Sequence, residues 1–89
     1  MSDNHIFKRG DQVAYVPPHA YGDLSHPDVE YGFVTSVKSD YDVAFCRYWS
    51  KFHPGLRTTA NSEATPVEYL VHTPHWRSQV EVDELLEGM

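Results

Sequence analysis

Hydrophobic and polar positions alternate near the start of the chain in the way that a half-buried β-strand requires. In residues 12–16 a valine and a tyrosine alternate with smaller or polar side chains, and the turn-forming pair Gly10-Asp11 comes just before them. Residues 1–9 are mostly polar. The pattern therefore predicts a first strand over residues 12–16 and a flexible arm over residues 1–9.

Two runs of β-branched and aromatic residues, at 32–37 and 43–49, predict a hairpin, because the residues between them are turn formers. Side chains alternate between the faces of a strand, so the second run has a smaller and a larger face. We expect the smaller face to point inward, as suits the crowded interior of a little barrel: it carries Ala44, Cys46 and Tyr48. The outward face then carries Phe45, Arg47 and Trp49. The opposite register stays open, since both faces hold aromatic side chains.

Loops and short elements flank this hairpin. Residues 17–30 contain three prolines and almost no periodicity, which predicts a long surface loop. A loop of this length in a small domain is often functional. Residues 50–57 predict a second loop, and residues 58–60 a short strand.

Two helix-start signals lie near the end of the chain. Residues 65–68 combine a threonine, a proline and a glutamate as a capping box does, and they predict one helical turn before a last strand at residues 70–72. Residues 78–81 form another capping box, which leads into apolar positions with helical spacing. A short C-terminal helix is therefore expected, and its acidic side chains are Glu81, Asp83, Glu84 and Glu87.

The composition of the chain limits the size of its core, the partners that it binds and its location in the cell. A chain of 89 residues that is 40% hydrophobic builds one small core. The net charge of −6 disfavours nonspecific binding to phosphate backbones, which depends on lysine and arginine. One cysteine excludes an internal disulfide, and the sequence has no apolar run long enough to cross a membrane. We expect no signal peptide, because the first four residues lack its charged and apolar regions. We therefore expect one domain in the cytoplasm that does not contact a membrane.

The order of these elements is also informative. Gly10-Asp11-Gln12-Val13, then Gly32-Phe33-Val34 and a further strand, and the helical turn at 66–69 before the last strand resemble the layout of small Src-homology-3-like (SH3-like) barrels. The resemblance implies an all-β fold of about five strands over residues 10–72, with residues 73–89 as an extension that carries the acidic helix. Gly32 is expected to let the chain bend sharply.

A run of residues between positions 15 and 34 is more specific. It consists of Tyr15-Val16-Pro17, His19-Ala20, Gly22-Asp23, His26-Pro27-Asp28, Glu30, Gly32 and Val34. This run resembles a family of short, largely uncharacterised proteins encoded by tailed bacteriophages and prophages, which implies an accessory protein acting in the host cytoplasm with no assigned activity. Relatives often carry cysteines at the positions of Val29 and Thr65, so a thiol or metal role there does not carry over. The segment after residue 71 lies outside the match.

The 17–30 loop gathers side chains that zinc or manganese accepts as ligands: His19, Asp23, His26, Asp28 and Glu30. Their spacing matches none of the usual metal motifs. We therefore favour hydrogen bonds to the loop backbone as the role of Asp23, His26 and Asp28, and we expect no metal or other cofactor. A metal site would bring His19, His26 and a carboxylate within ligand distance of one another.

Catalytic motifs are absent from the sequence. Cys46 with one of six histidines has the residue types of a nucleophile and its base, but a cysteine inside an alternating strand is typical of a small buried hydrophobe. The chain has no glycine-rich phosphate loop, no nucleophile elbow and no HExxH motif. We therefore expect a protein without enzymatic activity.

Aromatic side chains predict a binding surface: Phe45, Arg47 and Trp49 on the outward face, with Tyr21 and Tyr31 beside it. Such a surface suits peptides, and single-stranded nucleic acid stacks on the same kind of surface. The acidic helix is able to meet a basic surface on a partner. The structural alternatives are that the aromatics cover the ends of the barrel and that the acids form a solvated face.

These features predict a non-enzymatic phage accessory protein that binds a host or phage protein through its loops and an acidic and aromatic surface, with inhibition as one option. An apolar patch around Phe45, Trp49 or Trp76 would support this function. A metal-binding loop protein is the less favoured alternative, and a homodimer through an open edge strand also stays open. The other alternative is a nucleic-acid-associated barrel, whose basic residues would share one face: Arg47, Lys51, Arg57 and Arg77.

Overall fold

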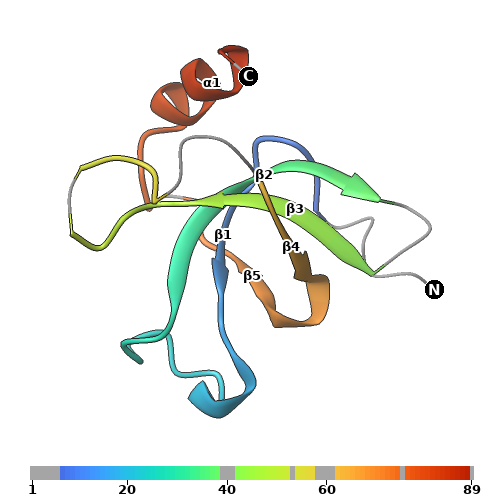
Figure 1. Ribbon diagram of the computed structural model, residues 1–89, viewed down its shortest axis with the longest axis vertical. Helices are drawn as coiled ribbons and strands as arrows, with labels where there is room; N and C mark the ends of the chain where they lie inside the picture. The colour runs from blue at the N-terminus through green and yellow to red at the C-terminus, as the bar shows by residue number, and fades with distance from the viewer. Residues whose placement is uncertain (1–6, 39–41, 53, 58–61, 75, 89) are drawn as a thin grey trace.

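The computed structural model describes residues 7–38, 42–52, 54–57, 62–74 and 76–88. These residues form a mostly β fold with one antiparallel sheet and one C-terminal helix (Figure 1). The strands are β1 (Gln12–Tyr15), β2 (Glu30–Lys38), β3 (Val43–Tyr48), β4 (Glu63–Pro66) and β5 (Leu70–His72). The helix is α1 (Gln79–Glu87), and the two short 3-10 turns are η2 (Pro18–Ala20) and η3 (Val67–Tyr69).

The sheet is strongly curled, and the reason lies in its connectivity. Its strand order is β4-β3-β2-β1-β5, so the two edge strands are consecutive in the chain and only η3 joins them. In a flat sheet these edges would lie about 19 Å apart, since neighbouring strands are about 4.8 Å apart. A 3-10 turn rises only about 2 Å per residue, so the sheet must bend until its edges approach one another.

The curled sheet is nevertheless open. Every pairing between neighbours is antiparallel, and within the described chain no pairing joins β4 to β5. The expected class, mainly β with a helical turn before the last strand and a C-terminal helix, is confirmed. A closed SH3-like barrel is not.

The predicted hairpin is confirmed as the β2–β3 pair, which contains a bulge. Val34 pairs with Cys46, but the next pair along is Ser36 with Phe45, so Thr35 is an extra residue on β2. The Thr35 hydroxyl donates to the Phe45 carbonyl at 3.0 Å. A bulge bends its strand and increases the local twist, which contributes to the curl of the sheet.

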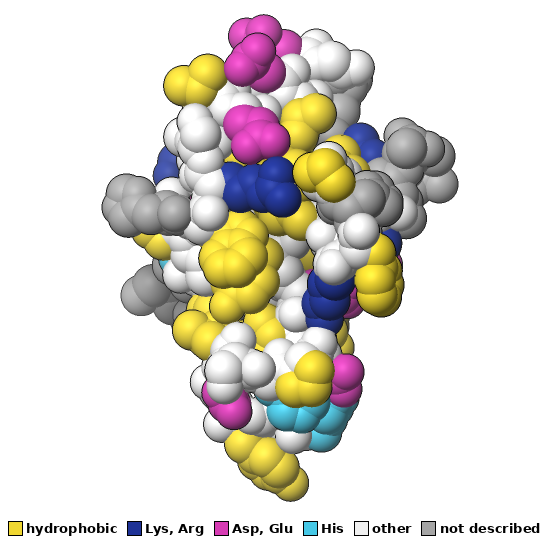
Figure 2. Space-filling view, turned by 90° about the vertical axis from the view of Figure 1, so that its left-hand side faces the viewer, with side chains coloured by type: hydrophobic (Ala, Val, Ile, Leu, Met, Phe, Trp, Pro, Cys, Tyr) yellow, Lys and Arg dark blue, Asp and Glu magenta, His cyan; other side chains and the backbone are white. Residues whose placement is uncertain are grey.

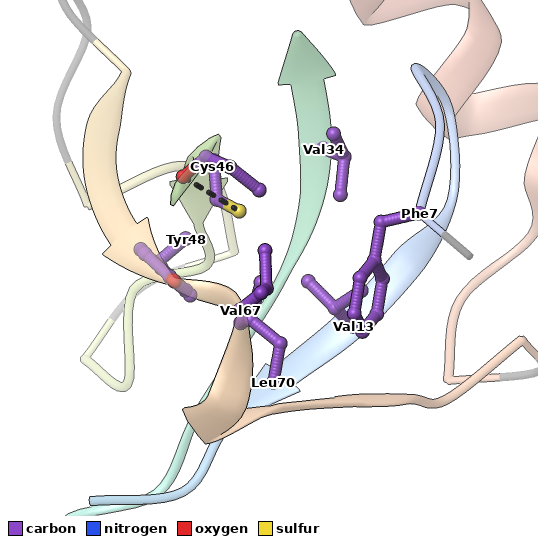
Figure 3. Close-up of a cluster of buried hydrophobic side chains, with 8 residues drawn as sticks. Phe7, Val13, Val34, Cys46, Tyr48, Val67 and Leu70 are labelled. Atoms are coloured by element: carbon purple, nitrogen blue, oxygen red, sulfur yellow. Dashed lines mark hydrogen bonds between the residues drawn. The ribbon is translucent and has the colours of Figure 1, made fainter. Parts of the chain in front are cut away.

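The inner face of the sheet holds the main core. Its buried side chains come from the segment before β1, from the first three strands, and from η3 and β5. Figure 3 shows them converging: Phe7, Val13, Val34, Ala44, Cys46, Tyr48, Val67 and Leu70. The inward positions expected for β3 are therefore confirmed. Phe7 lies in this core and its ring stacks on that of His72, with centroids 4.5 Å apart. The folded unit thus begins by residue 7, inside the arm expected at residues 1–9; residues 1–6 lie outside the described residues.

The outer face of the sheet is covered as well, which corrects one prediction from the sequence. α1 places Val82 and Leu86 against Phe33 and Trp49. As a result Trp49 is only 5% exposed. Arg47 is also buried, at 8% exposed, and Phe45 is half-buried. The expected outward platform therefore does not exist: α1 covers Trp49, and neither of the other two side chains is exposed.

Gln12 fixes the path that leads to α1. This buried side chain donates through Nε2 to the carbonyls of Pro74 and Arg77, at 3.1 and 2.7 Å, and its Oε1 accepts the Arg77 N–H at 2.8 Å. Arg9 adds a second link, since its guanidinium donates to the Thr35 and Leu86 carbonyls. Residues after β5 are therefore held against β1 and directed across the outer face.

Element boundaries near the C-terminus differ in detail from those expected. Thr65 belongs to β4, and η3 begins after Pro66 without a side-chain cap. Ser78 precedes α1 as expected, but its side chain makes no capping hydrogen bond. The strand expected at 58–60 lies outside the described residues. No helix in the described parts of the chain is long and apolar enough to cross a membrane.

Candidate functional site

The 17–30 loop is a chain of consecutive turns anchored by two buried side chains. Backbone N–H groups of Ala20, Asp23, His26 and Val29 each donate to the carbonyl three residues earlier, at 2.9 to 3.1 Å. Ala20 and Val29 pack with Ala14 and Val16 on the outer face of the sheet. Prolines begin the first turn, and Tyr21 and Gly22 reverse the chain with positive φ angles of 51° and 79°. The loop therefore has a defined shape.

This loop brings His19, His26 and Asp28 together at the surface. His19 Nε2 lies 2.6 Å from Asp28 Oδ2, and His26 Nδ1 accepts the Asp28 N–H at 3.0 Å. The two imidazole rings meet edge to face with centroids 5.2 Å apart. One ligand-type atom from each of the three residues lies within 4.8 Å of the others. The hydrogen bond with His19 holds the pKa of Asp28 below its usual value.

The remaining acidic candidates of the loop point elsewhere. Asp23 accepts hydrogen bonds from the hydroxyl and N–H of Ser25, at 2.7 and 2.9 Å, and these bonds lower its pKa. Glu30 pairs with Arg57, which also binds Glu63. Of the five loop residues singled out in the sequence, three converge. Asp23 and His26 make the hydrogen bonds to loop backbone groups that the sequence favoured, whereas Glu30 forms an ion pair with a side chain outside the loop.

A groove of about 510 Å³ lies between this loop and residues 49–52 with Arg57. Its charged groups are already paired: Lys51 donates to the Pro27 carbonyl, and Arg57 binds two carboxylates. The hydrogen bond that Arg57 donates to Glu63 is the main reason why the pKa of Arg57 is raised further. Phe52 stands almost fully exposed at its edge.

A second groove, of about 440 Å³, lies between residues 54–56 and α1, and we refer to it as the α1 groove. Trp49, Leu56 and Leu85 supply its apolar surface, while Glu81 and Glu84 supply its carboxylates. Arg77 lies over the Trp49 ring, 4.0 Å from the centroid, and donates to Glu81 at 3.3 Å. Such an arginine is held by a cation–π contact and an ion pair together.

The exposed aromatic residues do not form the platform that was expected. Tyr31 is half-buried and its ring stacks on Trp76, with centroids 3.8 Å apart and planes 9° from parallel. Trp76 is 52% exposed, and Tyr21 is almost fully exposed at the far end of the molecule. Figure 2 shows hydrophobic side chains gathered in the middle of one face, with acidic side chains at the α1 end, and histidines together with further acidic side chains toward the other end.

The four basic residues singled out for a nucleic-acid surface are separated by burial and pairing. Arg47 is buried, Arg57 and Arg77 bind carboxylates, and Lys51 binds a carbonyl. The acidic residues of α1 are exposed. Glu84 and Glu87 have no ion-pair partner within the described chain. Negative potential thus dominates the α1 end.

Cys46 lies in the inner core together with Tyr48 and Val67, as Figure 3 shows. Burial raises the pKa of its thiol to about 11, and its Sγ lies 3.9 Å from the Ala44 carbonyl. The thiol is therefore protonated at neutral pH.

The α1 groove could not be read directly from the sequence. The signals for it were present separately: Leu85 in the helical stripe, the acids of the same helix, and Trp49 at the end of β3. What was missing was the path of the chain after β5, which brings these residues together.

Comparison of the chain with protein-family models, curated protein sequences and solved structures finds no match.

Proposed function

We propose that this protein is a non-enzymatic binding module that holds a basic and apolar segment of another protein in the α1 groove. The observation that carries the proposal is the combination of Trp49, Leu56 and Leu85 with the carboxylates of Glu81 and Glu84 in one concave surface. An apolar surface with a few placed charges is the usual composition of a binding site.

The groove suits side chains with an apolar stem and a positive end. The stem of a lysine or arginine covers apolar surface while its charged end reaches outward. In this groove the stem would lie along Leu85 and Leu56, and the charge would meet Glu84, which has no ion-pair partner within the described chain. Long-range attraction from the acidic helix speeds the encounter with such a segment.

The resemblance of residues 15–34 to phage and prophage proteins favours a host or phage protein as the partner, met in the host cytoplasm. The order of elements, with the η3 turn before the last strand, supports an SH3-like layout for the binding module. Inhibition of the partner is one consequence that occupation of its basic segment would have.

The test is a peptide titration followed by amide chemical shifts. One peptide alternates leucine and lysine, and a matched peptide carries glutamate in place of lysine. We expect only the lysine peptide to shift the amides of Leu56, Glu84 and Leu85. Glu84→Lys should weaken this binding by about tenfold, since reversing a charge at an interface costs on the order of 1.4 kcal/mol or more.

Glu87→Lys is the matched control, because Glu87 is on the same helix and does not line the groove. It should leave the affinity nearly unchanged. Equal binding of both peptides, or shifts confined to the groove beside residues 17–30, would contradict the proposal. Co-purification from bacterial cells with the same three proteins then identifies the natural partner, which should be lost with Glu84→Lys alone.

A further inference from the structure

We propose that His19, His26 and Asp28 form a binding site for a zinc-like divalent metal ion. The three residues lie in the 17–30 loop, and none of them lines the α1 groove. The site is therefore independent of the binding function proposed above. Two imidazoles and one carboxylate are a ligand set that zinc accepts, and three protein ligands leave one coordination position for water.

The distances are close to those of a bound ion. Zinc ligands at about 2.0–2.2 Å from the ion lie about 3.4 Å from one another in a tetrahedral site. The three ligand-type atoms lie within 4.8 Å of one another, and His19 Nε2 and Asp28 Oδ2 are 2.6 Å apart. Binding thus requires this pair to open by about 0.8 Å and every other separation, at most 4.8 Å, to reach about 3.4 Å, which side chains at the surface accomplish by small rotations.

The exchange of bonds is balanced. The ion replaces the hydrogen bond between His19 and Asp28, and the proton of that bond moves to Nδ1 of the same ring or to solvent. In the neutral ring of His26 the lone pair is on Nδ1, which accepts the Asp28 N–H. This nitrogen donates its lone pair to the ion, and the exposed N–H of Asp28 forms a hydrogen bond to water instead. No buried polar group loses a partner.

The fold has already arranged the three ligands. η2 holds His19, the turn closed by Val29 N–H and the His26 carbonyl spans the other two, and the buried Ala20 and Val29 anchor the loop to the sheet. Most of the conformational entropy of collecting the ligands is therefore lost on folding rather than on binding. Figure 2 shows histidine side chains at the surface, where an ion has direct access.

The test is a titration of the untagged full chain with zinc, followed by the ring and amide signals of NMR spectra. We expect one saturable event that shifts the ring signals of His19 and His26 and the amide of Asp28, together with a rise in Tm. Asp28→Asn should weaken binding by at least about tenfold, the loss that even supporting groups around metal ligands cause. Asparagine keeps an oxygen that accepts a hydrogen bond from His19, so the loop should keep its shape.

His26→Ala is the second variant that changes a ligand of the site. Two further substitutions, outside the site, serve as matched controls. Asp23→Asn changes the same residue type in the same loop, and His72→Asn removes a histidine that lies in β5. Both should bind zinc within about twofold of the unaltered protein, since neither belongs to the cluster. Binding weaker than millimolar, shifts confined to other histidines, or unchanged affinity in Asp28→Asn would overturn the proposal.

Discussion

Gly32 lies where the backbones of β2 and β3 come closest. A Cβ atom at this position would be 2.1 Å from the Arg47 carbonyl oxygen, and its neighbours are backbone atoms that no rotamer change moves away. The sequence suggested glycine here for a sharp bend, but Gly32 has no positive φ and pairs with Tyr48 in a regular strand. The residue is required for close approach.

We therefore expect Gly32→Ala to lower the free energy of unfolding by about 3 kcal/mol, the upper part of the usual range for overpacking. Urea denaturation measures this loss in the free energy of unfolding. Gly88→Ala is the control, because its nearest neighbour would be the Leu85 carbonyl at 3.6 Å, an ordinary contact. That variant should stay within about 0.5 kcal/mol of the unaltered protein. Similar losses for both would mean that β2 and β3 can separate.

Cys46 makes stability depend on pH at the alkaline end. Burial raises the pKa of its thiol from 9.0 to about 11. Between these values the thiol is ionised in the unfolded chain and protonated in the folded one, so the free energy of unfolding falls as the pH rises from about 9 to 11. The loss from this group reaches about 3 kcal/mol, since one pKa unit corresponds to about 1.4 kcal/mol.

Tyr48 acts in the same direction, because burial raises its pKa too. Cys46→Ala separates the contribution of Cys46 from that of Tyr48. We expect the free energy of unfolding of this variant to fall less steeply between pH 9 and 10.5 than that of the unaltered protein. Urea denaturation at several pH values gives both slopes. Parallel slopes would show that Cys46 ionises without unfolding the chain.

At the scale of elements, α1 determines which side chains of the outer face of the sheet are buried. Val82 is fully buried against Phe33 and Trp49, whereas Val80 on the same helix is 66% exposed. Val82→Ala removes two buried carbon atoms and leaves a cavity, and it should cost about 2 kcal/mol. Val80→Ala is the same substitution without burial, and we expect a change within about 0.5 kcal/mol. Thermal unfolding of both variants checks this; equal effects would mean that α1 is not docked.

The sequence predicted the elements better than their contacts. Alternation predicted β1, and two runs of β-branched and aromatic residues around turn formers predicted the β2–β3 hairpin. The inward side chains of β3 were chosen by their smaller size, with the opposite register left open. The prediction failed for the other face of β3. Trp49 is covered by a helix that follows much later in the chain, and Arg47 is buried as well. A strand buried on both faces has no alternation from which this can be inferred.

β4 was missed for a different reason. Thr65 and Pro66 resemble a helix start, and they do precede η3, but Thr65 first pairs with Ala44 in the sheet. Similarly, the ligand types of the 17–30 loop were visible in the sequence, whereas their convergence depends on four consecutive turns and on Tyr21 adopting a positive φ. Residue types can be listed from a sequence, but irregular loop geometry cannot.

At the scale of the whole molecule, an open sheet raises the question of self-association. Edge strands have unpaired backbone groups that another copy is able to join. Here both edges are short: β4 has four residues and ends in Pro66, which has no N–H to donate, and β5 has three. Both faces of the sheet are covered, and the chain carries a net charge of −6. Self-pairing would gain few hydrogen bonds and would bring like charges together.

We therefore expect a monomer, in contrast to the homodimer that the sequence left open. Sedimentation equilibrium over a range from micromolar to about millimolar protein should give one species at moderate salt, where the residual repulsion between copies is screened beyond about 10 Å. Val71→Lys on β5, whose side chain is exposed, should change nothing, because no edge contact exists to be broken. A dimer that Val71→Lys dissociates would contradict this prediction and would identify β5 as its interface.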